Sequence, residues 1–224
     1  RLALQRLDEL PQGVARRTLA LRLRFKVARL ARRTQVALET ARLLAKHRAF
    51  SETAARSIMR GLAVELVQAA YDPSQLYKAW GQLDAAERNM PEVAILAAER
   101  MLSLGGEVNL AQQWLLPVWE QMVQPGSVLA PEQRLRLVQV LERSFAQEEG
   151  TPDAAWLTRI EAAQMGNPRD ALLQYLAGIA CMRLSLWGKA QQLLQQSLAQ
   201  QREPALKRNA WRALALLAEQ REED

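Results

Sequence analysis

The chain has 224 residues, 49% of them hydrophobic, and a formal net charge of +6. Its single cysteine, Cys181, excludes an internal disulfide, and its single histidine, His47, excludes a histidine cluster that would hold a metal ion. No stretch approaches the roughly 18 apolar residues that cross a membrane. Leu and Ala dominate the apolar residues, and β-branched and aromatic residues nowhere alternate as they do in strands. The sequence therefore predicts an all-α chain.

The positive charge is concentrated at the front of the chain. Residues 1–48 carry 13 Lys and Arg against the three acids Asp8, Glu9 and Glu39, a net charge of +10, whereas the remaining residues sum to −4. Such a segment binds nucleic acid, lies on anionic lipid, or is simply an arginine-rich solvated helix face. Phe25 is its only aromatic residue. Because base stacking needs interleaved aromatic side chains, no nucleic-acid partner is expected.

Prolines and glycines divide the chain into helices. Asp72–Pro73, Thr151–Pro152 and Asn167–Pro168 each combine a capping residue with a proline suited to the first helical turn. Glycines mark several helix ends. Pro117 should kink or break the helix that contains it, because it lacks an amide donor. The predicted helices span residues 13–47, 51–70, 73–88, 91–104, 107–124, 131–148, 152–165, 168–184, 187–200 and 204–221.

Helical pairs with small residues at their crossings are the most informative pattern. A glycine inside a helix costs about 1 kcal/mol relative to alanine, so Gly178 indicates a closely approaching neighbour, which we expect to be Ala190. Trp187 would fill that corner, as Phe50 would between residues 34–47 and 51–70. The three later pairs, each with its crossing alanine, are 91–104 with 107–124 (Ala111), 131–148 with 152–165 (Ala155), and 168–184 with 187–200 (Ala190).

Small crossing residues, a corner aromatic and a pitch of about 34 residues are typical of tetratricopeptide-like helical hairpins. We therefore predict a right-handed helical-repeat solenoid over residues 49–224, preceded by a basic helical segment over residues 1–48. Repeats of this kind form binding scaffolds and seldom catalysts.

Three segments of the chain are distinctive: LWGKA at Leu186–Ala190 with the following LLQQSL, WLLPVWE at Trp114–Glu120, and LLAKHRAFSETAARSIMRG after the arginine-dense front. Together they resemble the HemY family of proteobacterial inner-membrane proteins. The resemblance covers nearly the whole chain. Because the chain opens on Arg1, we expect it to be a fragment of a longer protein that has the family's two N-terminal membrane helices. The resemblance implies a basic juxtamembrane helix, tetratricopeptide-like repeats, a location at the cytoplasmic face of the bacterial inner membrane, and a role in late protohaem synthesis with proteins of that pathway as partners.

Residues capable of chemistry are few. His47 follows Lys46 near the end of a basic helix, where interaction with the helix dipole explains it better than axial haem ligation. Cys181 is interpreted as a small core residue. Asp84 and Glu87 are interpreted as a solvated pair rather than an acid–base pair. No catalytic residue or metal site is predicted.

Six tryptophans suggest either packing or ring stacking on a porphyrin. Trp114, Trp156 and Trp187 lie near helix starts, which favours packing, whereas Trp80 and Trp119 are the better candidates for exposure.

Two surfaces are predicted to bind partners. A stripe on the helix 168–184 would line a concave groove, and an arginine-rich helix over residues 13–48 would lie on an anionic membrane. The favoured function is a non-enzymatic scaffold; the alternatives are a haem or porphyrin carrier that uses the groove, and an enzyme of the late haem pathway. The stripe comprises Tyr175, Ile179, Met182 and Arg183, and the membrane-facing residues are Arg16, Arg17, Arg24, Arg29 and Arg32.

Overall fold

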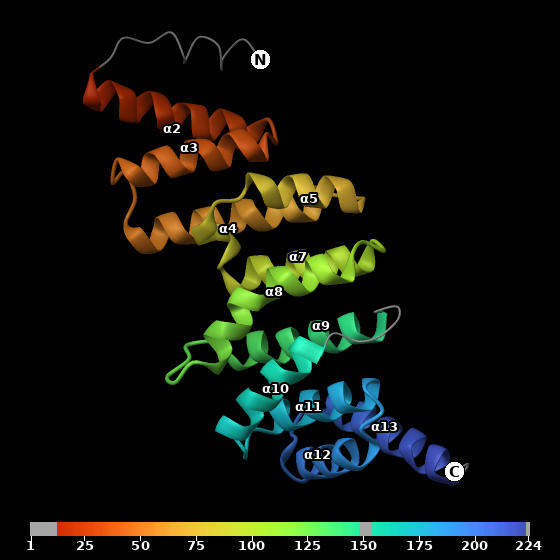
Figure 1. The fold of residues 1–224 in the computed structure, drawn as a ribbon. Helices are drawn as coiled ribbons and strands as arrows, with labels where there is room; N and C mark the ends of the chain where they lie inside the picture. The colour runs from red at the N-terminus through yellow and green to blue at the C-terminus, as the bar shows by residue number, and fades with distance from the viewer. Residues whose placement is uncertain (1–12, 148–153, 223–224) are drawn as a thin grey trace. The chain divides into compact units, whose positions relative to one another are not determined.

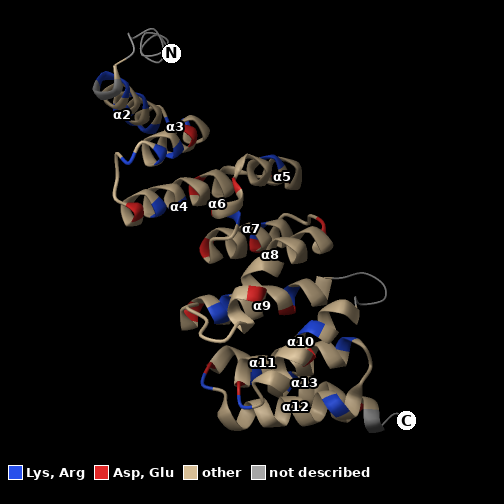
Figure 2. Cartoon of the chain, turned by 60° about the vertical axis from the view of Figure 1, so that its left-hand side comes forward, with Lys and Arg blue, Asp and Glu red and all other residues tan. Residues whose placement is uncertain are grey.

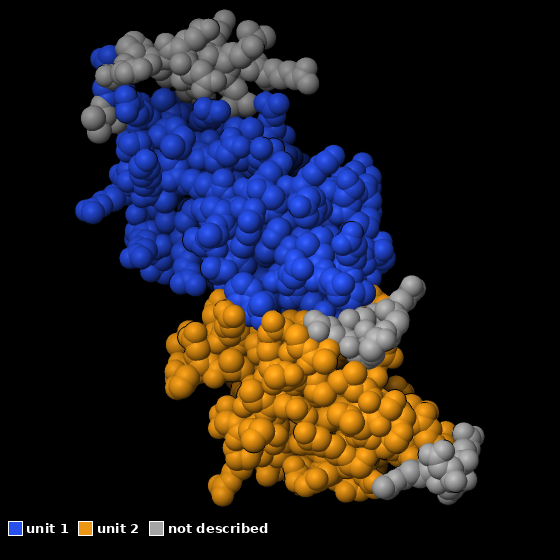
Figure 3. All heavy atoms as spheres, viewed as in Figure 1, with its two compact units in different colours: residues 1–118 blue, residues 119–224 orange. Residues whose placement is uncertain are grey.

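The computed structural model describes residues 13–147 and 154–222, and every regular element within them is a helix (Figure 1). This confirms the predicted all-α class for the described residues. The chain divides into two compact units, residues 1–118 and 119–224 (Figure 3). The boundary between these units falls inside one helix, directly after Val118. The division at residue 48 between a basic segment and a repeat domain stays a prediction.

Unit 1 contains six whole helices and the first part of a seventh among its described residues. Neighbours along the chain pack together, as α2 does with α3 and α3 with α4, and α4 also packs against α7. The helices are α2 (Val14–Leu30), α3 (Thr34–Lys46), α4 (Glu52–Ala69), α5 (Pro73–Gln82), α6 (Ala85–Arg88), α7 (Pro91–Ser103) and α8 (Val108–Val123), which continues into unit 2.

In unit 2 the described helices are arranged around α11. This helix packs against the helix on either side of it in the chain and also against the helices two positions away. The helices are α9 (Pro131–Gln147), α10 (Ala154–Gly166), α11 (Ala171–Arg183), α12 (Trp187–Gln200) and α13 (Pro204–Glu222).

Capped prolines begin helices largely as predicted. Asp72 accepts a hydrogen bond from the Gln75 amide, and Pro73 is the first residue of α5. Thr151–Pro152 lies outside the described residues. The Asn167–Pro168 prediction is wrong, because α11 begins at Ala171 and Asp170 is its cap, accepting from two backbone amides. Arg134 of α9 forms an ion pair with the Asp170 carboxylate. This contact, with a residue distant in sequence, stabilises Asp170 as the cap, three residues after the predicted cap at Asn167.

Four helices end in turns of the same type. The sequence predicted only one of these turns, at Gly105. The residue after each C-cap has a positive φ: 53° at Arg32, 53° at Arg48, 58° at Ser185 and 71° at Gly105. The amide of the following residue then donates back to the helix over 2.8–2.9 Å, which is the Schellman arrangement. The single helix predicted over residues 13–48 is therefore wrong: it turns at Arg32, and α2 packs against α3 as a hairpin.

The α11–α12 crossing depends on Gly178. A Cβ atom at this position would lie 2.7 Å from Cγ of Leu194 and 3.3 Å from its backbone nitrogen. The close approach is as predicted, but the facing residue is Leu194, one turn beyond Ala190. Ala111 and Ala190 are buried, whereas Ala155 is exposed and is not a crossing residue.

Tryptophans form much of the core. Trp80 stacks on Trp114 in unit 1 with ring centroids 4.5 Å apart, and Trp119 meets Trp156 edge to face in unit 2. Trp80 and Trp119 are both buried, so the prediction that they are exposed is wrong. Helix α8 continues through Pro117, which lies just before the boundary between the units. The exposed tryptophan is Trp211, on α13.

Candidate functional site

The predicted stripe on α11 is only partly at the surface. Tyr175 has no exposed area, which corrects its placement on an open face. Ile179 and Met182 are half-buried and Arg183 is exposed, so the accessible part of the stripe is the C-terminal half of the helix.

The Tyr175 side chain is buried because it belongs to a polar network that joins three helices. Its hydroxyl donates to a Glu142 carboxylate oxygen of α9 over 2.5 Å. Asn209 of α13 hydrogen-bonds to both side chains. Burial raises the pKa of Glu142 above its ordinary value, and the two hydrogen bonds offset part of that rise. Burial and the neighbouring carboxylate also raise the pKa of Tyr175, so the hydroxyl stays protonated and donates.

The three members of this network are regularly spaced in sequence. Glu142 precedes Tyr175 by 33 residues, and Tyr175 precedes Asn209 by 34. They lie on α9, α11 and α13, and α11 packs against both of the others. Three residues on alternate helices therefore meet at one place. Because the residues are a glutamate, a tyrosine and an asparagine, no similarity of residue type revealed this register in the sequence.

Cys181, also on α11, is fully buried, as its interpretation as a core residue predicts. Burial and the nearby Glu161 carboxylate raise the pKa of its thiol to about 11. The thiol is therefore protonated at neutral pH and has little nucleophilic character.

The five arginines proposed to face a membrane differ in exposure and in their partners. Arg16 and Arg17 are exposed near the start of α2, and Arg24 is half-buried. Arg29 donates to both carboxylate oxygens of Glu65 on α4, over 2.8 and 2.6 Å. Arg32 lies in the turn that ends α2. Lys and Arg positions are nevertheless frequent along α2 and α3, as the blue segments of the ribbon in Figure 2 show.

The outer face of α2 combines these charges with exposed leucines. Leu19, Leu23 and Leu30 are 59%, 44% and 77% exposed. With Lys26 they follow i, i+4, i+7 and i+11 spacing, so all four lie on one side of the helix. Apolar residues also occur on the side facing α3, which hid this stripe from sequence reasoning. Within the described residues, no helix has the combination of length and apolar character needed to cross a bilayer.

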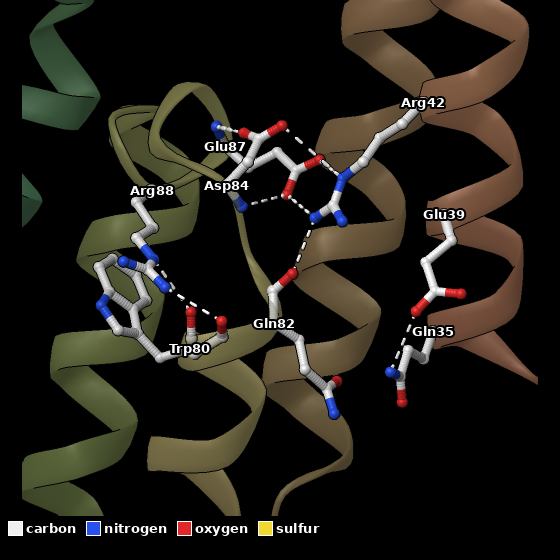
Figure 4. A network of polar contacts seen from close by, with 9 residues as sticks. Gln35, Glu39, Arg42, Trp80, Gln82, Asp84, Glu87 and Arg88 are labelled. Carbon is white, nitrogen blue, oxygen red and sulfur yellow. Dashed lines mark hydrogen bonds and ion pairs between the residues drawn. The ribbon is translucent and has the colours of Figure 1, made fainter.

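Asp84 and Glu87 stabilise the start of α6 (Figure 4). The interpretation of Glu87 as solvated is wrong. Asp84 caps α6 by accepting from the Glu87 amide over 2.9 Å, while the Glu87 carboxylate accepts from the Asp84 amide. Glu87 is fully buried and accepts from two nitrogens of Arg42 on α3, at 2.8 and 2.5 Å. Arg42 also donates to the backbone oxygen of Gln82. This ion pair connects the front hairpin to the rest of unit 1.

Chemistry-bearing clusters are otherwise sparse. His47 is the exposed C-cap residue of α3, the position predicted for it. Among the described residues, no three His, Cys, Asp or Glu side chains are grouped as metal ligands.

The described residues thus define the protein's class as all-α, with packing mostly between helices close in sequence. Comparison of the chain with protein-family models, with curated proteins and with solved structures finds no match.

Proposed function

We propose that this protein is a non-enzymatic scaffold built as a tetratricopeptide-like, right-handed solenoid. The observation that carries the proposal is the meeting of Glu142, Tyr175 and Asn209 at intervals of 33 and 34 residues on three neighbouring helices. A repeat of about 34 residues produces such a register. The close α11–α12 crossing at Gly178 supports the same arrangement.

The accessible half of α11 offers a binding surface for a protein partner. Ile179 and Met182 supply apolar area, and the exposed Arg183 supplies a cation at the end of the stripe. A helix with a matching apolar face and a carboxylate fits this pattern. The outer face of α2 offers a second surface, in which Leu19, Leu23 and Leu30 would enter an anionic bilayer interface while basic side chains meet lipid phosphates.

The cellular setting is proposed from the resemblance to the HemY family. By that resemblance, the protein would lie at the cytoplasmic face of the bacterial inner membrane and would support a late stage of protohaem synthesis by holding proteins of that pathway together. Burial of Cys181, with a thiol pKa of about 11, and a single exposed histidine support a non-catalytic role.

The test is capture of partners by the full-length protein from its own membranes, followed by mass spectrometry. Enzymes of late protohaem synthesis should be enriched with the wild-type chain and lost with Arg183→Glu combined with Met182→Ala. Arg202→Glu changes an exposed arginine outside α11 and serves as the matched control. Enrichment of an unrelated set of proteins, or an identical set from the double variant, contradicts the proposal.

A haem or porphyrin carrier is the second candidate, favoured by the position of exposed Arg183 beside half-buried Ile179 and Met182. A tetrapyrrole would lie on the apolar side chains with a propionate on the guanidinium. Titration of haemin into the purified chain should then give a saturable Soret shift that Arg183→Ala abolishes. The absence of such a shift, with partner capture intact, selects the scaffold.

A further inference from the structure

A pocket in unit 1 lies outside both surfaces discussed above. It encloses about 740 Å³ between the α3–α4 turn, the N-terminal half of α4 and the segment leading into α7. This volume falls within the roughly 300–1,000 Å³ typical of ligand pockets.

Apolar side chains form part of the pocket lining, alongside polar ones. Met90 forms part of the floor and is 5% exposed, and Phe50 and Met59 are half-buried at its sides. Phe50 is held by an edge-on contact with Phe25, whose ring centroid lies 6.5 Å away. Methionine side chains adapt to differently shaped apolar partners, because they are unbranched and polarisable. These side chains therefore offer apolar contacts to a ligand that also carries polar groups.

The rim of the pocket carries two arginines and one acid, so its net charge is positive. Arg48 and Arg56 are exposed, and neither guanidinium pairs with a carboxylate among the described residues. Glu52 is the acid of the rim. Three other arginines of unit 1 are instead paired with acids of the same unit: Arg29 with Glu65, Arg42 with Glu87, and Arg60 with Glu92.

We propose that this pocket docks an acidic, amphipathic segment of a partner protein. Its large apolar side chains would contact Phe50, Met59 and Met90, and its carboxylates would pair with Arg48 and Arg56. The open rim, with exposed residues on both α4 and the preceding turn, favours a segment anchored by side chains over an enclosed small molecule. The site does not depend on the α11 stripe, so it extends the proposed scaffold to a second partner of stated chemistry.

Methionine methyl groups provide a site-resolved test. The chain has six methionines. Met59 and Met90 line the pocket, Met101 is buried in α7, and Met182 reports on the α11 stripe. The whole chain, labelled with ¹³C at the methionine methyls, is titrated with two helical peptides of about 14 residues, roughly four turns. Both carry leucines at i, i+3, i+4 and i+7; one has glutamate and the other lysine at the remaining positions.

The glutamate peptide should shift Met59 and Met90 saturably while Met101 and Met182 stay in place. Arg56→Glu should weaken its binding by at least about tenfold, whereas Lys78→Glu, at an exposed lysine of α5, should not. Equal binding of the lysine peptide overturns the proposal, as does the absence of shifts at Met59 and Met90. A shift confined to Met182 also overturns it, while supporting a site on α11.

Discussion

Substitution of Gly178 tests the helix crossing on which the repeat interpretation depends. In Gly178→Ala the new Cβ would lie 2.7 Å from Cγ of Leu194 and 2.9 Å from its Cδ2. Leu194 is fully buried, and its backbone nitrogen is only 3.3 Å from the new atom, so α11 and α12 must separate slightly. Overpacking costs about 1–3 kcal/mol, and better helix propensity returns about 1 kcal/mol. We expect a net loss of about 1 kcal/mol.

The free energy of unfolding is measured by urea denaturation followed by circular dichroism. Gly188→Ala in α12 is the matched control, since a Cβ there meets nothing within 4 Å and should leave stability unchanged or slightly raised. Leu194→Ala should cost less in the Gly178→Ala background than in the wild type, because the added methyl fills part of the space that the leucine leaves. If Gly178→Ala is as stable as Gly188→Ala, the crossing is not as tight as described.

Three further features are tested by substitution in the same denaturation assay. Glu87→Ala should cost about 3 kcal/mol, because it leaves the Arg42 guanidinium without its buried partner, whereas Glu65→Ala in the exposed pair should cost under about 1 kcal/mol. Ser185→Gly should raise stability by about 1 kcal/mol, because φ is 58° there. Glu142→Gln should flatten the pH profile. Burial raises the pKa of Glu142 in the folded state above the ordinary carboxyl value. Ionisation of Glu142 therefore lowers the stability of the wild type as pH rises from the ordinary carboxyl pKa to the raised one.

Local signals predicted most helix positions but few of the contacts between helices. Pro73, Pro91 and Pro204 begin helices because proline fits a first turn wherever the chain packs. The turns at Arg32 and Ser185 were hidden, since non-glycine residues rarely adopt a positive φ and only the hydrogen bonds of the finished turn reveal them.

The site residues were predicted less well, because their environment comes from helices distant in sequence. Helical periodicity predicted one exposed stripe for Tyr175 and Met182, but Tyr175 is buried. Its hydrogen-bond partners are Glu142, 33 residues earlier, and Asn209, 34 residues later. The sequence alone suggested that Glu87 is solvated beside Asp84, whereas its ion-pair partner is Arg42, 45 residues away. A single sequence contains these residues without indicating that they meet.

The hairpin at the front of the chain changes the expected character of membrane binding. Arginines near an anionic surface contribute about 1 kcal/mol each, but Arg29 is already paired with Glu65. Leu19, Leu23 and Leu30 are 44–77% exposed, and burying that area contributes about 1 kcal/mol per side chain. Electrostatic and apolar contributions are therefore similar in size. Because salt screens only the first, binding should weaken with salt but persist in part.

Sedimentation with vesicles of phosphatidylcholine, with and without phosphatidylglycerol, separates these contributions. Leu19→Ser with Leu30→Ser should remove the binding that survives at high salt, since these leucines are the most exposed on α2. Arg16→Ala with Lys26→Ala should instead weaken binding at low salt and leave the residual fraction in place. Leu43→Ser is the control, because this leucine of α3 is similarly exposed but lies off the α2 face. Equal sedimentation with neutral and anionic vesicles, or loss of binding in the control, would show that the outer face of α2 is not the lipid-binding surface.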